Sequence, residues 1–169
     1  MGSDAPGHSR ANDVMLHFAY GSNMHREVMR RHAPNAEPLG VASLADYRFV
    51  ITTDGYASVE PARTRTVQGV LWRLTPRDRV SLDTWEGIAS GQYRAEILPV
   101  RRGGLRRTAL VYVAPRCGAG RPKAGYMELV LFAARAWNLP PDYIASLQRW
   151  LPAQPLGAGG RNLKEFGWT

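Results

Sequence analysis

The sequence predicts an α+β fold, in which strands and helices occupy different parts of the chain. Short apolar runs typical of strands cluster in the first two thirds of the 169 residues, and helical patterns come mostly late. A repeating parallel βαβ unit would alternate the two kinds of element instead. Hydrophobic residues make up 44% of the chain and charged residues 21%, as in globular proteins. A chain of this length can bury a substantial core as one compact domain.

The first strands are expected where apolar runs end at turn residues. Met15–Tyr20 is a short apolar and aromatic run that stops at Gly21. Leu39–Thr52 alternates loosely and predicts one or two strands. Tyr56–Val59 and Val67–Leu74 predict two further strands with a polar turn between them.

A hairpin is expected later in the chain. Tyr93–Arg101 and Arg106–Ala114 read as strands, and Gly103-Gly104 between them favours a tight turn.

Two helices are predicted in the first half of the chain. One runs from about Met24 to His32 and is closed by a proline. The second has clear boundary chemistry: Thr75 can cap it, Pro76 suits its first turn, and Asp78 sits three residues after the cap. It should run to about residue 85, where a glycine can end it.

Two more helices follow the hairpin. Tyr126–Asn138 has apolar residues at helical spacing, including Leu129 and Phe132, which predicts a core-facing stripe. A proline pair then stops this helix and starts another, with a stripe that includes Ile144 and Leu147.

We expect a flexible leader over residues 1–13, one domain over residues 14–151 and a tail over residues 152–169. The leader is small and polar without an apolar h-region, which argues against a signal peptide. No apolar run approaches the roughly 18 residues that span a bilayer. The single cysteine, Cys117, allows no intramolecular disulfide and has no evident activating partner. These features predict a soluble, cytoplasmic protein.

The charge is uneven along the chain. The formal net charge is +8, and residues 61–121 alone hold 12 arginines against four acidic residues. Arg101, Arg102, Arg106 and Arg107 surround the predicted hairpin turn. Nucleic acid could use this tip, but no aromatic residue interleaves with the arginines, as a single-strand binder would require. A solvated, charge-rich hairpin that discourages edge pairing is the alternative.

Two other segments are candidates for chemistry. In the FAYGSN segment, a strand runs into Gly21 and a helix start, which leaves backbone N–H groups without an intrahelical partner. Such a turn can hold a carboxylate or an oxyanion; a simple turn capped by Ser22 or Asn23 is the alternative. In the LDTWEGIASGQY segment, Glu86 falls at a helix carboxyl end, beside Trp85. The helix dipole and apolar neighbours should raise its pKa and suit it to proton transfer, unless it is a solvated helix-end acid.

Other chemistry has weak support. Ser22 lacks the G-x-S-x-G pattern of serine hydrolases. His25 and His32 are accompanied by no carboxylate or cysteine pattern, so a metal site is weakly indicated.

Taken together, these segments resemble the γ-glutamylcyclotransferase family, including its AIG2-like relatives. The resemblance begins at HFAYGSNM and continues through VQGVLWRLT, LDTWEGIASGQY and GYMELVLFAARAWNLPPDYIASL, in that order. It covers most of residues 15–150. The tail and the arginine-rich middle depart from the family and inherit no role.

The resemblance implies a small mixed β-barrel with helices packed around it and a pocket at one end. It implies that Glu86 is catalytic and that Tyr93 and Tyr126 contact the substrate, with Tyr112 as a weaker match. The family's glutamyl-binding loop corresponds to the following residues, with His17 just before them: Phe18, Ala19, Tyr20, Gly21, Ser22 and Asn23.

The implied reaction is attack of a substrate α-amine on its own γ-carbonyl, which releases 5-oxoproline and an amine or amino acid. One carboxyl with a raised pKa can take and return the proton, and no metal or cofactor is required. The implied partner is a small γ-glutamyl compound, with no specific nucleic acid and no membrane. The alternative is a non-catalytic module that binds a small ligand or nucleic acid on the arginine-rich surface.

Overall fold

The computed structural model describes residues 15–115 and 118–152. The expected leader, the tail after residue 152 and Cys117 lie outside these residues.

Five strands close into a barrel in the order β1-β3-β2-β4-β5. The strands are β1 (Met15–Ala19), β2 (Glu37–Ile51), β3 (Ala57–Leu74), β4 (Arg94–Arg102) and β5 (Leu105–Val113). All neighbours are antiparallel except β1 and β5, which run parallel and meet at His17 and Leu110. The predicted α+β class and the small mixed barrel are therefore confirmed.

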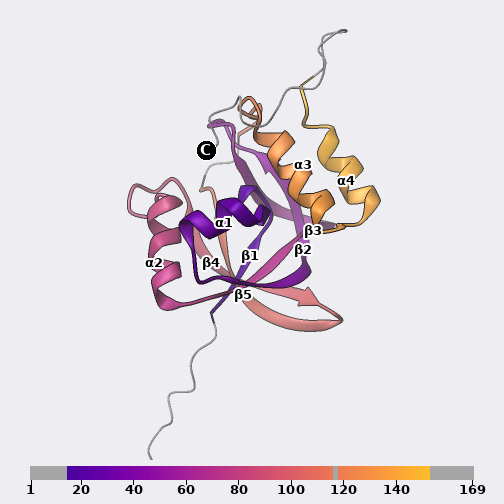
Figure 1. Cartoon of the computed structure of the whole chain (residues 1–169). Helices are drawn as coiled ribbons and strands as arrows, with labels where there is room; N and C mark the ends of the chain where they lie inside the picture. Colours follow the sequence, from indigo (N-terminus) through magenta and orange to yellow (C-terminus); the bar gives the residue numbers. More distant parts are fainter. Residues whose placement is uncertain (1–14, 116–117, 153–169) are drawn as a thin grey trace, which may run out of the picture.

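Helices cover the barrel from two sides. They are η1 (Ser22–Met24, a 3₁₀ turn), α1 (Arg26–His32), α2 (Pro76–Trp85), α3 (Tyr126–Ala136) and α4 (Pro141–Gln148). Figure 1 shows α3 and α4 side by side on one flank, with α2 on the other and α1 between them. None of the helices in the described part of the chain is long and apolar enough to cross a membrane.

The expected turn between residues 59 and 67 was wrong. Residues 57–74 form one strand, and β2 pairs with β3 along almost its whole length. The polar stretch is exposed to solvent on this two-stranded ribbon. Its irregularity is a bulge, where Asp46 and Thr64 have positive φ and the Thr64 N–H donates to Asp46 Oδ1 over 3.1 Å. The polar residues of this stretch are therefore explained by their exposure to solvent, and the chain does not turn there.

The stripe predicted on α3 was partly wrong. Leu129 is buried, but Phe132 is 51% exposed and contacts the His25 ring instead. The helix buries most of its circumference, so helical spacing alone could not select its outer side. Leu147 of α4 is buried, as expected.

The boundary chemistry of α2 was correct. The Asp78 N–H donates to Thr75 Oγ1 over 3.1 Å, and the Thr75 N–H donates to Asp78 Oδ2 over 3.2 Å. This reciprocal capping box, with Pro76 in the first turn, fixes where the helix begins. Its length then places residue 86 at the carboxyl end, next to the end of β1.

Candidate active site

A cavity of about 270 Å³ opens where β1 ends, between the barrel and the end of α2. All ten site residues expected from the sequence line it, together with five others. The expected ones are His17, Phe18, Ala19, Tyr20, Gly21, Ser22, Asn23, Glu86, Tyr93 and Tyr126; the others are Tyr56, Ala57, Trp85, Gln92 and Tyr112. The structure thus brings residues from five parts of the chain together around one cavity. The volume suits a small molecule or one end of a larger one.

Glu86 is the carboxyl group of this wall. It caps the carboxyl end of α2, and its backbone N–H donates to the Leu82 carbonyl over 2.8 Å. The side chain accepts a hydrogen bond of 2.7 Å from Asn23 Nδ2 at Oε1. Desolvation by burial raises the pKa of Glu86 to about 7, the Asn23 hydrogen bond lowers it, and the negative charge of Asp83 raises it. A carboxyl with this pKa can both accept and return a proton near neutral pH.

The loop after β1 forms another part of the wall, next to Glu86. Its η1 turn is closed by hydrogen bonds from the Met24 N–H to the Gly21 carbonyl and from the His25 N–H to the Ser22 carbonyl. Gly21 itself is forced by a close approach: a Cβ there would lie 2.7 Å from the Tyr126 Oη. Only glycine lets the loop backbone lie this near the phenol.

Two tyrosines clamp the backbone of Ala57 at the start of β3. The Tyr93 hydroxyl donates to the Ala57 carbonyl over 2.8 Å, and the Ala57 N–H donates to the Tyr126 Oη over 3.2 Å. Burial raises the pKa of Tyr126 to about 12, although hydrogen bonds from Ala57 and Ser22 lower it. These contacts fix residues from the α2–β4 connection and from α3 against the barrel.

The phenols give the wall a common chemical character. Tyr93 donates its only hydroxyl proton to the Ala57 carbonyl, and Tyr20 donates its own to the Tyr112 carbonyl. A hydroxyl whose proton is committed can only accept further hydrogen bonds. Together with the Glu86 carboxyl, these oxygens suit a ligand that carries N–H donors, such as an ammonium group.

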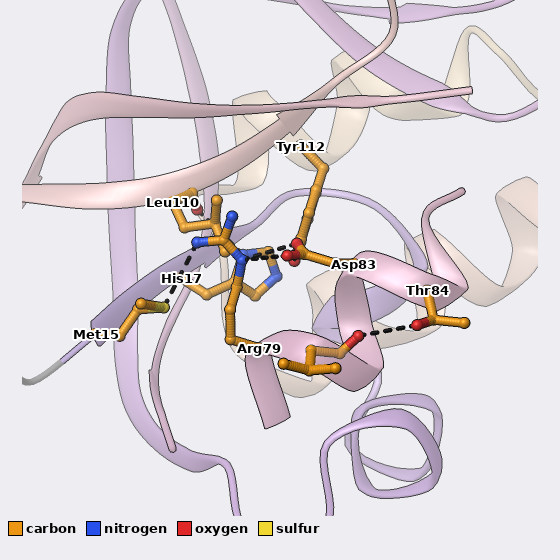
Figure 2. A network of polar contacts seen from close by, with 8 residues as sticks. Met15, His17, Arg79, Asp83, Thr84, Leu110 and Tyr112 are labelled. Atoms are coloured by element: carbon orange, nitrogen blue, oxygen red, sulfur yellow. Dashed lines mark hydrogen bonds and ion pairs between the residues drawn. The ribbon is translucent and has the colours of Figure 1, made fainter. Parts of the chain in front are cut away.

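His17 is buried behind this wall, with 2% of its surface exposed. Its Nδ1 lies 3.1 Å from the Leu110 carbonyl, which can only accept, so Nδ1 carries the proton. Burial lowers the pKa of His17 to about 4, which leaves the ring neutral at physiological pH. Among the described residues, its buried Nε2 has no hydrogen-bond partner. Figure 2 shows the ring beneath Arg79 and beside Tyr112.

Sequence reasoning missed four lining residues entirely. Trp85 and Gln92 are chain neighbours of Glu86 and Tyr93, and adjacency was the only signal for them. Tyr56 directly precedes β3 and Ala57 is its first residue, and no local pattern connects either of them to the site. Tyr112, the weaker match, does line the cavity.

Two other candidates lie elsewhere. Arg101, Arg102, Arg106 and Arg107 are exposed at the β4–β5 tip and do not line the cavity. Within residues 15–115 and 118–152, no group of three or more histidine, cysteine, aspartate or glutamate side chains is placed to hold a metal ion. His32 instead stacks on Trp85, with ring centroids 3.7 Å apart.

Comparison with known proteins shows which of them this chain is similar to. Residues 66–147 match the model of the AIG2-like family. The mouse protein named gamma-glutamylcyclotransferase is 29% identical over 167 residues, with 92% of this chain and 89% of the mouse chain covered. The human protein of the same name is 26% identical, with 91% and 88% covered.

The solved structures agree with the sequence comparison. A structure named gamma-glutamyl cyclotransferase matches the fold with a TM-score of 0.79 at 24% identity, covering 90% of this chain and 97% of that chain. The chain is thus similar in sequence, over most of its length, to proteins named gamma-glutamylcyclotransferase, it shares their fold, and residues 66–147 resemble the AIG2-like family.

Proposed function

We propose that the protein is a γ-glutamylcyclotransferase, which releases 5-oxoproline from a γ-glutamyl compound. The observation that carries this proposal is the position of Glu86. Its carboxyl has a pKa of about 7 and lines one small cavity together with the loop that follows β1. The same cavity is lined by tyrosines whose hydroxyl protons are already donated to protein acceptors. The relatives that bear this enzyme's name support the same activity.

In the proposed reaction, the Glu86 carboxylate first takes a proton from the substrate's α-ammonium group. The free amine attacks the γ-carbonyl carbon, forming the new carbon–nitrogen bond of a five-membered lactam. Glu86 returns its proton to the leaving nitrogen as the tetrahedral intermediate collapses and the bond to that nitrogen breaks. The ring nitrogen then loses its second proton to the Glu86 carboxylate, and this proton passes to the released amine. No water is consumed, and the substrate's atoms are divided between 5-oxoproline and an amine or amino acid.

The cavity supplies geometry as well as the proton carrier. Nucleophile and electrophile belong to one molecule, so the protein mainly has to fold the glutamyl chain into attack geometry. The acceptor oxygens of the wall suit the ammonium end of the substrate. The backbone of Gly21, Ser22 and Asn23 is the proposed support for its carboxylate or for the developing oxyanion. These residues need no metal or cofactor for any step.

The test is a panel of γ-glutamyl compounds whose leaving groups are amino acids, dipeptides, simple amines, polyamines and a lysine side chain. Purified protein should release 5-oxoproline from at least one of them, measured by chromatography with mass detection. EDTA should leave the rate unchanged. A strict metal requirement, or no turnover across the whole panel, contradicts the proposal.

A further inference from the structure

A polar network behind the cavity links α2 to β5. The Tyr112 hydroxyl donates a hydrogen bond of 2.7 Å to Asp83 Oδ1. Arg79, one helical turn before Asp83, donates from Nε to both carboxylate oxygens over 2.7 and 2.9 Å. Figure 2 shows the Asp83 carboxylate held between the guanidinium and the phenol, with His17 alongside.

The network fixes the direction of the Tyr112 proton. A guanidinium can only donate, and the carboxylate that it pairs with can only accept. The phenol must therefore be the donor to Asp83, and its only proton points away from the cavity. Any further hydrogen bond at the Tyr112 oxygen has to be accepted by it.

Tyr112 is also held rigidly in place. Only 3% of its surface is exposed, and its backbone carbonyl accepts the Tyr20 hydroxyl proton. Its ring packs on the neutral His17 ring, with centroids 5.3 Å apart at an interplanar angle of 59°. Arg79 is in turn in contact with Met15, over 3.6 Å from its Nη1 to the Met15 Sδ. The Tyr112 side chain, which lines the cavity, is therefore held in one orientation.

A bound ammonium group makes a demand that this phenol meets. An ammonium has three N–H donors, and those that are buried need acceptors. Glu86 supplies one acceptor, and Tyr112 lines the same cavity with its oxygen restricted to accepting. We propose that Asp83 is a positioning residue for the reaction: by accepting the hydrogen bond of the Tyr112 hydroxyl, it leaves the phenol oxygen free to act only as an acceptor for the α-ammonium of the γ-glutamyl substrate. The inference rests on the proposed function.

The first arm of the test measures KM and kcat for Asp83→Asn, Tyr112→Phe and the double variant. Both single variants should lower kcat/KM about 10- to 100-fold, the range for a hydrogen bond to a charged group. Most of the loss should fall on KM, because the ammonium is present in the bound ground state. Adding Asp83→Asn to Tyr112→Phe should cost little more, since Asp83 acts through the phenol.

The second arm measures the pH dependence of kcat/KM, which separates the loss of the Asp83 charge from the loss of the Tyr112 acceptor. The negative charge of Asp83 raises the pKa of Glu86, so Asp83→Asn should move the acid limb to lower pH. Tyr112→Phe should leave this limb near its wild-type position. Among the described residues, the titratable groups that line the cavity with Glu86 are His17, Tyr20, Tyr56, Tyr93, Tyr112 and Tyr126. The charge of Asp83, which is paired with Arg79, also acts on Glu86.

Glu27→Gln is the matched control. It removes an exposed helical ion pair of 2.6 Å with Arg30 on α1, outside the cavity. Both KM and the acid limb should stay at wild-type values in this variant. If Asp83→Asn does not fold, the KM of Tyr112→Phe still tests whether the Tyr112 oxygen binds the ammonium, because this variant removes one oxygen from a buried ring of unchanged shape.

The outcomes separate the two proposals. Wild-type KM in Tyr112→Phe, or independent multiplicative losses in the double variant, overturns the positioning role while the activity stands. If the wild-type protein turns over no compound of the panel, the proposed function fails and the positioning role falls with it.

Discussion

Asn23 and Glu86 lie 63 positions apart in the chain, yet the Asn23 amide donates a hydrogen bond of 2.7 Å to the Glu86 carboxyl. This contact joins the loop after β1 to the end of α2 in the wall of the cavity. Asn23 is itself 7% exposed, so its amide has little water to bond instead. The proton carrier of the proposed reaction is therefore held by the loop that is proposed to bind the substrate.

The first prediction concerns this contact. Asn23→Ala removes a hydrogen bond that lowers the pKa of Glu86, so that pKa should rise above about 7. The acid limb of kcat/KM should then move to higher pH, measured as a full pH–rate profile. Asn35→Ala is a matched control, because Asn35 donates to Asp78 away from the cavity. An acid limb that stays in place or moves down contradicts the prediction.

The second prediction tests the close approach of the loop to α3. Gly21→Ala places a methyl group 2.7 Å from the Tyr126 Oη and 3.2 Å from the Ala57 Cβ, which the wall cannot absorb without shifting. We expect a loss of about 1–3 kcal/mol in the free energy of unfolding, typical of overpacking. Urea denaturation measures it. Tyr126→Phe removes the nearer atom, so the double variant should recover part of the loss; equal losses with and without the phenol would argue against this contact.

The third prediction follows from linkage between protonation and folding. The pKa of Glu86 is about 7 in the folded protein, whereas the ordinary value of a glutamate is 4.5. Between these two pH values the folded state therefore binds more protons than the unfolded state. Stability from this group is therefore lost as pH rises from about 4.5 to about 7. Glu86→Gln carries no such cost. The melting temperature of Glu86→Gln minus that of the wild type should increase from about pH 4.5 to about pH 7 and stay constant above it. A difference that decreases with rising pH would contradict this prediction.

The fourth prediction concerns the basic tip of the β4–β5 hairpin. Its four arginines are exposed without interleaved aromatic residues, so nucleic acid should bind only weakly, with a Kd of about 10⁻⁴–10⁻⁶ M, and be displaced by salt. A filter-binding titration at physiological ionic strength measures this. Tight, sequence-selective binding that disappears when Arg101, Arg102, Arg106 and Arg107 are neutralised would favour the rival binding module.

Local chemistry made much of the fold predictable. The capping box at Thr75 and Asp78 set the start of α2, and the Gly103-Gly104 pair set the β4–β5 turn. The long β3 strand was missed because its exposed, polar half resembles a turn in sequence. Its strand character comes from pairing with β2, which no local pattern reports.

The site divides in the same way. Glu86 and the loop from Phe18 to Asn23 stand in contiguous motifs, and the structure places them in one cavity, while their roles remain predictions. The hydrogen bond from Tyr112 to Asp83 joins residues 29 positions apart on different elements. Its geometry depends on how α2 packs beside β5, so only the folded chain could reveal it.

The most direct test of the proposed mechanism is the turnover of Glu86→Gln on the best substrate of the panel. Glutamine keeps the shape of the side chain and an oxygen that can accept from Asn23, but it cannot take the ammonium proton. We expect kcat to fall at least about 10²–10⁴-fold, the range for general acid–base catalysis, with substrate affinity changed far less. A folded Glu86→Gln protein with near wild-type kcat would contradict the account.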